Sequence, residues 1–211
     1  MADDLSAVEK VLPVSRETAE RLSAYVGLLR KWQPAENLIS PKTLPEIWRR
    51  HIADAAQLVR LYPSDRRWID LGSGAGLPGL VIAICLASGS MVHMVESNRR
   101  KCAFLRAAIR ETGAPADVYE GRVEDVLDQW TEPVDRVTAR ALAPLAQLLK
   151  LAKPVMAKGV PAAFMKGQGW EAEVEVGRRD WNFDLATHDS LTGEGGVILD
   201  IRSLRAAGES E

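Results

Sequence analysis

The stretch Ile69–Leu80, IDLGSGAGLPGL, decides the fold of this chain. It places glycines at 72, 74, 76 and 79 between an apolar strand pattern and an apolar helix pattern. A turn of this composition lets the backbone come close to a bound ligand, because glycine lacks a Cβ and adopts positive φ freely. The spacing Gly74-x-Gly76-x-x-Gly79 matches the dinucleotide fingerprint, which alone is a weak signal. The stretch therefore predicts a dinucleotide or another adenosine compound as ligand.

Outward from this turn, strand and helix patterns alternate from residue 66 onward. Such alternation predicts a parallel sheet with helices on both faces, which is an α/β three-layer sandwich. The last two strand patterns, joined by Thr192–Gly196 (TGEGG), are typical of a hairpin that supplies an antiparallel edge strand. Strands are expected over 67–72, 91–97, 116–122, 135–141, 160–167, 183–191 and 195–204, and helices over 77–88, 98–113, 123–130 and 144–156, with an acidic helix from 170.

The first 65 residues carry helix patterns throughout. Ser15 is a typical N-cap for a helix over 15–32, in which apolar residues recur on one face. A second amphipathic pattern covers 43–62 and is stopped by Pro63. We therefore expect an N-terminal helical cap over 1–65, a Rossmann-like domain over 66–204 and a frayed tail over 205–211, all in one compact unit.

The composition is that of an ordinary globular protein, with 211 residues of which 46% are hydrophobic and 27% are charged. No run approaches the roughly 20 apolar residues that span a bilayer, and the acidic N-terminus, Met1–Asp4, lacks the apolar region of a secretory signal. Cys85 and Cys102 have no metal-ligand spacing and indicate no disulfide framework. We expect a cytoplasmic protein that needs no metal and acts as a monomer.

Positive charge is concentrated in two segments, although the formal net charge is −2. Between Arg21 and Arg67, nine Lys or Arg residues stand against four acids, and between Arg99 and Arg110 five stand against none. A basic side on a mildly acidic protein suits a polyanionic partner that is held through its phosphates. Solvated helix faces explain the same charges equally well.

Two carboxylates narrow the choice of ligand. Asp70 precedes the first glycine of the turn, where it would oppose a pyrophosphate but suit a cation such as a sulfonium or an ammonium group. Glu96 ends the next strand, where an acid can accept both hydroxyls of an adenosine ribose. NAD and S-adenosylmethionine both carry that ribose, so only Asp70 favours a methyl donor. The structural alternatives are a turn carboxylate at position 70 and a helix N-terminal acid at position 96.

Seven short motifs follow one another along the chain, namely Trp32 with ENL (36–38), HIAD (51–54), DLGSGAGLPG (70–79), VESNRRKCAFLR (95–106), GRVED (121–125), TARALAPL (138–145) and MKGQ (165–168). No single motif is decisive, but seven in this order and spacing are strongly specific. In these motifs, over about Leu22–Arg202, the chain resembles the RsmG/GidB family of bacterial methyltransferases. Gln33 and Ile39 depart from the family pattern, since many relatives have Asn and Thr there.

The resemblance implies a Rossmann-like S-adenosylmethionine-dependent methyltransferase fold with a seven-stranded, mostly parallel sheet. It also implies methyl transfer from S-adenosyl-L-methionine to N7 of a guanosine in 16S rRNA of the small ribosomal subunit, guanine 527 of the decoding region. The product is S-adenosyl-L-homocysteine. The family implies cofactor contacts at Gly72, Leu77, Val123, Glu124 and Arg140, and the wider methyltransferase pattern adds Asp70, Gly74, Gly76 and Glu96.

Arg140 follows a strand pattern, so we expect it at the carboxyl edge of the sheet. Its guanidinium can hold the methionine carboxylate, an RNA phosphate or a guanine edge, or form a structural salt bridge, so it is only a candidate for positioning. The segment ARALAPL (139–145) lacks the Asn/Asp-Pro-Pro-aromatic pattern of methyltransferases that act on amines. Guanine N7 has a free lone pair and needs no base or covalent nucleophile, so we identify no catalytic residue for those roles.

The helical cap contributes four residues to these motifs. Trp32 is expected in the core, and Asn37 is expected to cap or turn the chain. His51 and Asp54 are three residues apart on one helix face, so we expect His51 to bond Asp54 or a backbone carbonyl in a structural role. RNA phosphate contacts are predicted for eight cations, namely Arg30, Lys31, Arg49, Arg50, Arg99, Arg100, Lys101 and Lys166.

Three other functions stay open at this level. The glycine spacing favours an NAD-dependent oxidoreductase, although the chain shows no evident Tyr/Lys or His/Asp pair for hydride transfer. A non-catalytic RNA-binding module is compatible with the same scaffold because a fold does not establish chemistry, but the intact glycine turn and Glu96 argue against it. A small-molecule methyltransferase would not need a cationic cap.

Overall fold

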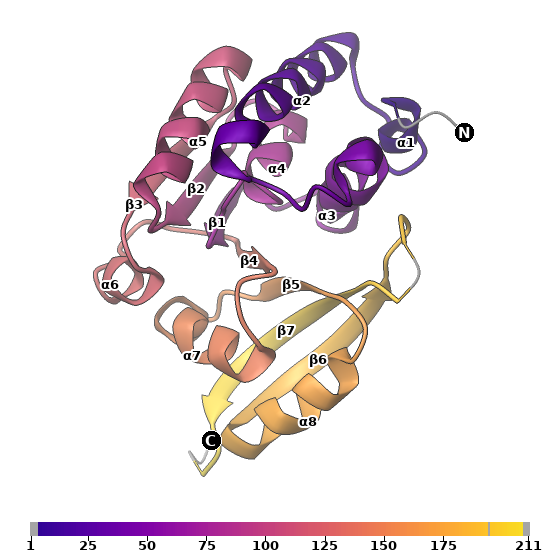
Figure 1. The fold of residues 1–211 in the computed structure, drawn as a ribbon. Helices are drawn as coiled ribbons and strands as arrows, with labels where there is room; N and C mark the ends of the chain where they lie inside the picture. Colours follow the sequence, from indigo (N-terminus) through magenta and orange to yellow (C-terminus); the bar gives the residue numbers. More distant parts are fainter. Residues whose placement is uncertain (1–3, 194, 209–211) are drawn as a thin grey trace.

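The computed structural model describes residues 4–193 and 195–208 and contains a seven-stranded sheet with the strand order β3-β2-β1-β4-β5-β7-β6 (Figure 1). Six strands run parallel to one another, and β7 is antiparallel to both of its neighbours. The predicted α/β class and seven-stranded, mostly parallel sheet are confirmed. The strands are β1 (Arg67–Leu71), β2 (Met91–Glu96), β3 (Ala116–Glu120), β4 (Arg136–Arg140), β5 (Ala162–Lys166), β6 (Trp181–Asp189) and β7 (Val197–Ala206).

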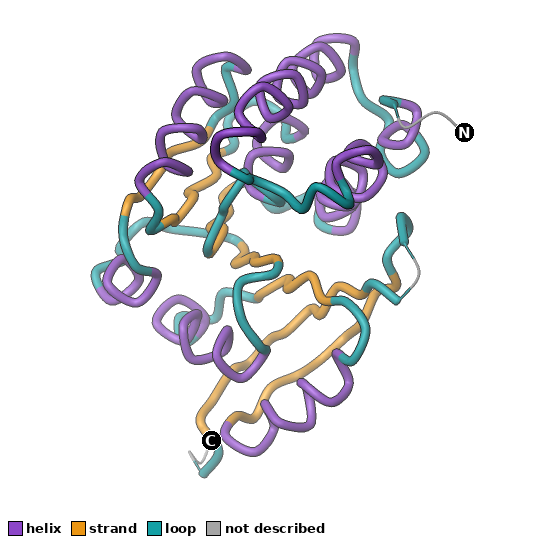
Figure 2. The backbone as a smooth tube through the Cα atoms, viewed as in Figure 1, coloured by secondary structure: helices purple, strands orange, loops and turns teal. Residues whose placement is uncertain are grey.

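Helices cover both faces of the sheet and make the outer layers of the sandwich (Figures 1 and 2). One layer holds α2 (Arg16–Glu36), α3 (Asp54–Leu61), α4 (Gly79–Cys85) and α5 (Arg99–Thr112), and the other holds α6 (Val123–Asp128), α7 (Leu145–Met156) and α8 (Trp170–Asp180). The short helix α1 (Ser6–Glu9) packs beside the first of these layers. Each layer has its own apolar cluster against the sheet, because each helix buries one apolar stripe.

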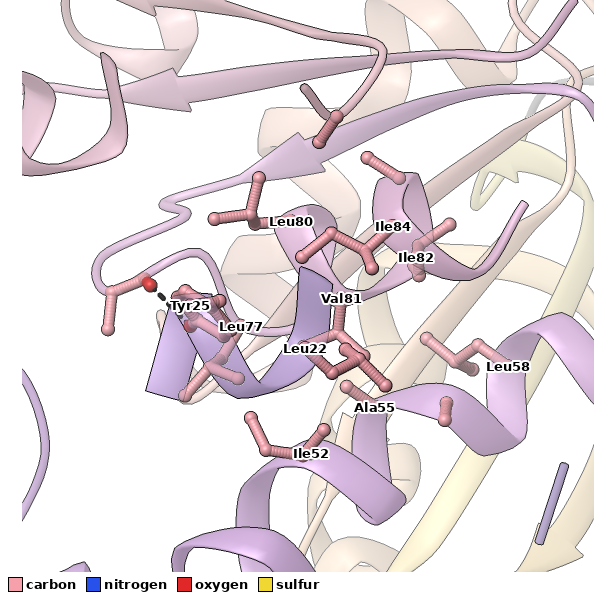
Figure 3. Close-up of a cluster of buried hydrophobic side chains, with 14 of the residues drawn as sticks. Leu22, Tyr25, Ile52, Ala55, Leu58, Leu77, Leu80, Val81, Ile82 and Ile84 are labelled. Atoms are coloured by element: carbon pink, nitrogen blue, oxygen red, sulfur yellow. Dashed lines mark hydrogen bonds between the residues drawn. The ribbon is translucent and has the colours of Figure 1, made fainter. Parts of the chain in front are cut away.

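The N-terminal helices share a hydrophobic core with the glycine-turn helix α4. Leu22 and Ile52 pack with Leu80 and Val81 in one buried cluster (Figure 3). Tyr25 of α2 is fully buried, and its hydroxyl donates a 2.7 Å hydrogen bond to the carbonyl of Ala75 inside the glycine turn. The N-terminal segment therefore supports the turn directly.

The ends of α2 follow the sequence closely. Ser15 caps its start, with the side chain accepting from the amide of Thr18 at 3.1 Å, as predicted. Asn37 ends it in the left-handed conformation, with φ of 45°, which confirms the predicted cap. Trp32 is half-buried against the ring of Phe104, with 5.7 Å between centroids, so its predicted core role is also confirmed.

The second N-terminal helix differs from the expected single α-helix. It consists of a 3-10 turn, η1 (Leu44–Glu46), a π-helical turn, η2 (Trp48–Ala53), and then α3. The spacing of apolar residues does not distinguish these windings over one or two turns, because i+3, i+4 and i+5 neighbours all lie near one face. π-Helical turns concentrate at functional sites, and η2 contains Arg50 and His51.

The C-terminal hairpin is present and supplies an antiparallel edge strand, as predicted, and it is the second strand of the pair, β7, that joins the hairpin to the rest of the sheet. β7 pairs with β5 on one side and β6 on the other, so β6 is the edge strand. The burial agrees, since Val197–Ile201 is buried continuously whereas β6 alternates between buried and exposed residues. A nearly uninterrupted apolar run is typical of an interior strand, so the run VILDI (197–201) could have identified β7 as the interior strand of the hairpin.

The chain ends also bear on the predictions. At the C-terminus, Arg205 and Ala206 of the expected tail belong to β7, and residues 209–211 lie outside the described residues. At the N-terminus, the expected lack of a secretory signal rested on Met1–Asp4, of which residues 1–3 also lie outside the described residues. No helix in the described part of the chain has the length and apolarity required to cross a membrane.

Candidate functional site

The glycine turn joins β1 to α4 at the carboxyl edge of the sheet. Gly72, Gly74 and Gly76 have φ angles of 67°, 56° and 87°, a region that side chains other than glycine rarely adopt. A Cβ at Gly72 would lie 2.5 Å from Cδ1 of Leu142, so this glycine permits close packing. A Cβ at Gly74 would meet only the Gly72 carbonyl, at 3.8 Å, so the backbone at Gly74 is open to a ligand.

Asp70 is fully buried at the end of β1. Its Oδ2 accepts a 3.1 Å hydrogen bond from the amide of Gly79, and a Cβ at Gly79 would fall 2.6 Å from that oxygen. Its Oδ1 is buried and has no hydrogen-bond partner among the described residues. Burial raises the pKa of Asp70 from 3.8 to about 7. This carboxyl therefore holds the start of α4, the structural alternative considered for it, while one oxygen remains unsatisfied.

The raised pKa of Asp70 predicts a pH-dependent stability. Between about pH 4 and pH 7 the folded protein keeps a proton that the unfolded chain has released, so the free energy of unfolding falls as the pH rises through this window. Asp70→Asn removes the titration and retains an acceptor for Gly79. Urea unfolding at several pH values should show wild type losing stability relative to the variant from about pH 4 to pH 7. A constant difference would contradict this prediction.

Glu96 ends β2 beside the glycine turn. Its Oε2 accepts from the amide of Gly74 at 2.8 Å, and its Oε1 accepts from the amide of Asn98 at 2.7 Å. An ionised carboxylate offers about four lone-pair sites, so each oxygen can accept one more hydrogen bond. The two backbone contacts fix the carboxylate next to the open face of Gly74, and both oxygens can still accept a hydrogen bond from a bound ligand.

The turn after β3 lies next to Glu96. The amide of Gly121 donates to the Glu96 carbonyl at 3.0 Å, and Val123 and Glu124 follow at the start of α6. Val123 is buried and Glu124 is exposed, a pairing of an apolar surface with a free carboxylate. Leu77 is buried within the glycine turn itself. The structure thus gathers the predicted cofactor residues of β1, β2 and β3 at one edge of the sheet.

Arg140 ends β4 at the same edge and is bound by the N-terminal helices. Its Nη2 donates to the carbonyl of Arg50 at 3.1 Å and to Nδ1 of His51 at 2.9 Å, and its Nη1 lies 3.6 Å from Oδ2 of Asp54. Burial, followed by the charges of Arg140 and Arg50, lowers the pKa of His51 to about 4. His51 is therefore neutral near pH 7 and accepts at Nδ1.

The expected bond from His51 to Asp54 or to a backbone carbonyl is wrong. The ring nitrogens of His51 meet Arg140 and the hydroxyl of Thr43, the latter at 2.8 Å. The two residues do share a helix face, but Arg140 enters between them from β4, a distant segment that helix spacing cannot reveal. Asp54 contacts the hairpin instead, because its Oδ1 accepts from Ser190 at 3.1 Å and from Thr192 at 2.9 Å.

A cavity of about 1060 Å³ opens beyond Arg140, between the ends of β4 and β5, the hairpin turn and the N-terminal helices. Its lining includes the cations Arg49, Arg50, Arg140 and Lys166 and the acids Asp54 and Glu173. It is at the upper end of the size of small-molecule sites, so it can admit a nucleotide with part of its neighbours. Leu142 lines this cavity and also packs on Gly72, so the cavity and the glycine turn share a wall.

The eight predicted RNA-binding cations lie on four elements. Arg30 and Lys31 are exposed on α2, Arg49 and Arg50 are exposed on η2, and residues 99–101 begin α5. Arg99 forms an ion pair with Glu120 at 3.2 Å, although its side chain remains 90% exposed. Lys166 is different, because its Nζ binds the Ala143 carbonyl and Glu173, both at 2.7 Å.

Several polar contacts of the site were not predicted from the sequence. Tyr25 was assigned to the apolar face of its helix, Ser190 to a strand and Thr192 to the hairpin turn. Gln33, which departs from the family pattern, closes a ring with Ile39: its Nε2 donates to the Ile39 carbonyl at 2.7 Å and its Oε1 accepts from the Ile39 amide at 3.0 Å. These partners are distant in sequence or are backbone groups, so the residue types carried no signal.

Metal-ligand clusters are not found in the described ranges: no group of three or more His, Cys, Asp or Glu side chains there could hold a metal ion. Cys85 and Cys102 are both free thiols.

Comparisons with known proteins point to one family. A family model described as GidB, rRNA small subunit methyltransferase G, matches residues 18–200. A protein of Bradyrhizobium diazoefficiens named ribosomal RNA small subunit methyltransferase G is 50% identical over 200 residues, which cover 94% of this chain and 77% of that protein. A protein of the same name from Chelativorans sp. is 47% identical over 208 residues, with 97% and 99% of the two chains covered.

Solved structures are similar in fold at low sequence identity. An O-methyltransferase of Bacillus cereus, solved in complex with SAH, aligns with a TM-score of 0.59 and 16% identity over 94% of this chain and 96% of that one. The O-methyltransferase TomG of Streptomyces achromogenes, solved with SAM, has the same TM-score and identity, with 94% and 95% covered. These likenesses confirm the predicted Rossmann-like methyltransferase fold.

Proposed function

Because the chain belongs to the GidB family of small-subunit ribosomal RNA methyltransferases, we propose that it transfers the methyl group of S-adenosyl-L-methionine to N7 of a guanosine in 16S rRNA, at guanine 527. The observation that carries this proposal is the pairing of the open backbone at Gly74 with the Glu96 carboxylate, beside a cavity lined by cations. A ribosomal substrate places the reaction in the cytoplasm, and a monomer is sufficient for it.

The residues at the carboxyl edge suit the methyl donor. Glu96 retains lone pairs for two ribose hydroxyls, and Val123 offers an apolar surface to an adenine ring with Glu124 at the ring's edge. Gly74 admits the ligand to the backbone. The donor supplies an electrophilic methyl group on a sulfonium. Asp70 is close to the turn, but its contact with Gly79 makes its effect on the donor indirect.

The chemistry at N7 needs little from acidic or basic side chains. The N7 lone pair attacks the methyl carbon as the carbon–sulfur bond breaks, so the positive charge passes from sulfur to the purine and no proton is lost. Rate enhancement then rests on in-line placement of the two reactants and on their removal from water. Arg140, which lines the cavity at the same edge of the sheet as the glycine turn, is the candidate for positioning an anionic group of either reactant.

The cavity beyond Arg140 is where the target base would enter. A base must leave its stack to reach a pocket of this kind, while its backbone is held on cationic side chains. Residues 1–65 and 66–204 then form one binding unit, since Arg49 and Arg50 come from the first and Lys166 from the second. Lys166 is committed to Glu173, and Arg49 is committed to Glu46 and to the carbonyl of Thr192, so among these three we expect Arg50 to contribute most to phosphate binding.

The basic start of α5 gives a testable RNA footprint. Replacing Arg99, Arg100 and Lys101 together with alanine should weaken RNA binding and reduce its salt slope by about two to three, because each phosphate contact adds roughly 0.7–0.9. The affinity for S-adenosyl-L-homocysteine should be unchanged. Binding to a 16S rRNA fragment across a salt series measures both the RNA affinity and its salt slope.

The matched control replaces three exposed cations of α7 and α8, which lie far from α5 in Figure 1, namely Lys150, Arg178 and Arg179. An unchanged slope in the α5 variant would remove these residues from the footprint.

Two experiments test the function itself. Calorimetric titration with S-adenosyl-L-homocysteine and with NAD separates a methyltransferase from an oxidoreductase, and binding of NAD alone would contradict the proposal. Incubation with labelled S-adenosyl-L-methionine and small subunits from cells that lack this activity should then label guanine 527. Borohydride reduction followed by aniline scission detects N7-methylated guanosine, so a label that gives no scission would place the methyl group on another atom.

A further inference from the structure

Three residues that are distant in sequence meet at the guanidinium of Arg140. His51 and Asp54 lie on consecutive turns of η2 and α3, and Arg140 reaches them from the end of β4. We infer that His51 and Asp54 are positioning residues that hold the Arg140 guanidinium in one orientation where it lines the cavity, at the edge of the sheet that also carries the proposed donor site. This inference rests on the proposed function, because it assigns a role within the proposed reaction.

The hydrogen-bond directions around His51 are fully determined. An arginine has only donors, so Nδ1 of His51 must accept from Arg140 Nη2. The hydroxyl of Thr43 donates to the carbonyl of Ser40 at 3.0 Å, so it accepts from Nε2–H of His51. His51 is therefore a neutral ring with its proton on Nε2, fixed between Thr43 and Arg140. Its side chain is buried, which removes water as a competing partner.

Asp54 acts on the other nitrogen of the guanidinium. Its Oδ2 lies 3.6 Å from Nη1 of Arg140, a charge contact that is longer than a hydrogen bond. Its Oδ1 accepts from Ser190, Thr192 and Gln57, which prevents the carboxylate from turning. The hairpin thus holds the Asp54 carboxylate in place, and this carboxylate in turn restrains the position of the charged Arg140 guanidinium.

One donor group of Arg140 has no acceptor in this arrangement. Nη2 is used twice, by the Arg50 carbonyl and by His51, whereas Nη1 is buried and has no hydrogen-bond acceptor among the described residues. Because Arg140 also lines the cavity, a carboxylate or phosphate oxygen of a bound reactant that displaces the atoms covering Nη1 would satisfy it. Without His51 and Asp54 the long arginine side chain would sample several rotamers, and reactive placement tolerates errors of only about 1 Å.

A double-mutant cycle tests whether His51 and Asp54 act through Arg140. His51→Leu and Asp54→Asn should each lower kcat/KM for RNA methylation by about 10- to 100-fold, the cost of misplacing a reacting group. In an Arg140→Ala background, either change should cost less than about twofold more. His51→Asn places an amide oxygen near the position of Nδ1 and should recover most of the activity. Additive losses, or no recovery with asparagine, would overturn the inference.

Matched controls and a second readout keep the result distinct from a folding defect or a wrong function. His188→Leu and Asp184→Asn, both on β6, should leave kcat/KM near the wild-type value. Side-chain ¹⁵N NMR at pH 7 needs no activity, and it should show His51 neutral, protonated at Nε2, with an Nδ1 resonance that shifts in Arg140→Ala. A charged ring, or an Nδ1 resonance indifferent to Arg140, would overturn the inference even if the protein methylates RNA. The expected NMR result in a protein that does not methylate RNA would contradict only the proposed function.

Discussion

Glu96→Ala is expected to weaken the binding of S-adenosyl-L-homocysteine by about 100-fold or more. The substitution removes the acceptor for two ribose hydroxyls, and hydrogen bonds to a charged group contribute roughly 1.5–3 kcal/mol each. It also leaves the amides of Gly74 and Asn98 without their carboxylate partner, which loosens the turn that the ligand must meet. Isothermal titration calorimetry measures the affinity directly.

The matched control for this variant is Glu120→Ala. Glu120 ends β3 opposite Glu96 in the sheet register, but it is exposed and pairs with Arg99 and Arg106 on the surface. Its removal should change the affinity by less than about threefold, because exposed ion pairs contribute little. If Glu96→Ala stays within threefold of wild type while remaining folded, Glu96 does not bind the donor and the proposed cofactor site is wrong.

Arg136→Ala is expected to give the largest loss of stability, about 3–5 kcal/mol in the free energy of unfolding. Arg136 begins β4 at the edge opposite the site, with a side chain that is only 5% exposed. It binds Asp65 at 2.5 Å and Asp200 at 3.3 Å, and its guanidinium stacks 3.5 Å above the ring of Tyr62. Without it, two carboxylates lose a buried positive partner and an aromatic ring loses its packing.

Urea unfolding of Arg136→Ala measures this loss, and Arg67→Ala provides the comparison. Arg67 begins the neighbouring strand β1, but its pair with Asp135 is partly exposed, with the arginine side chain 47% accessible, so a loss of less than about 1 kcal/mol is expected. Below its unfolding transition, Arg136→Ala should still bind S-adenosyl-L-homocysteine like wild type, because the network lies away from the glycine turn. A stability loss near that of Arg67→Ala would show that the buried network contributes little.

Much of the fold could be predicted because its determinants are local. The glycine turn, the helix cap at Ser15 and the alternation of strands with helices each depend on residues within a few positions of one another. The order of the two hairpin strands in the sheet was not predicted, because it is not local. Which of two hairpin strands pairs with β5 is a choice between long-range neighbours, and only the continuous apolar run of β7 hinted at the answer.

In the candidate site, too, some residues could be predicted from the sequence and others could not. Gly74 and Glu96 were predicted because a sheet brings the carboxyl ends of neighbouring strands together, so strand order alone gathers them. The partners of Arg140 could not be predicted, because they join η2, α3 and β4 across about 90 positions of sequence. The same holds for Asp54 and the hairpin, and for Tyr25, whose hydroxyl reaches Ala75 from a helix face that otherwise looks apolar.

By itself, the sequence determined the class of fold, the position of the glycine turn and the family, since each depends on local spacing and on the order of short motifs. Only the tertiary structure decided which groups face one another across that turn: the neutral His51 against Arg140, Asp54 against the hairpin, and the burial of Asp70. The physical reason is that backbone geometry follows from neighbouring residues, whereas the charge state and hydrogen-bond partners of a buried polar side chain follow from whatever distant segment packs against it.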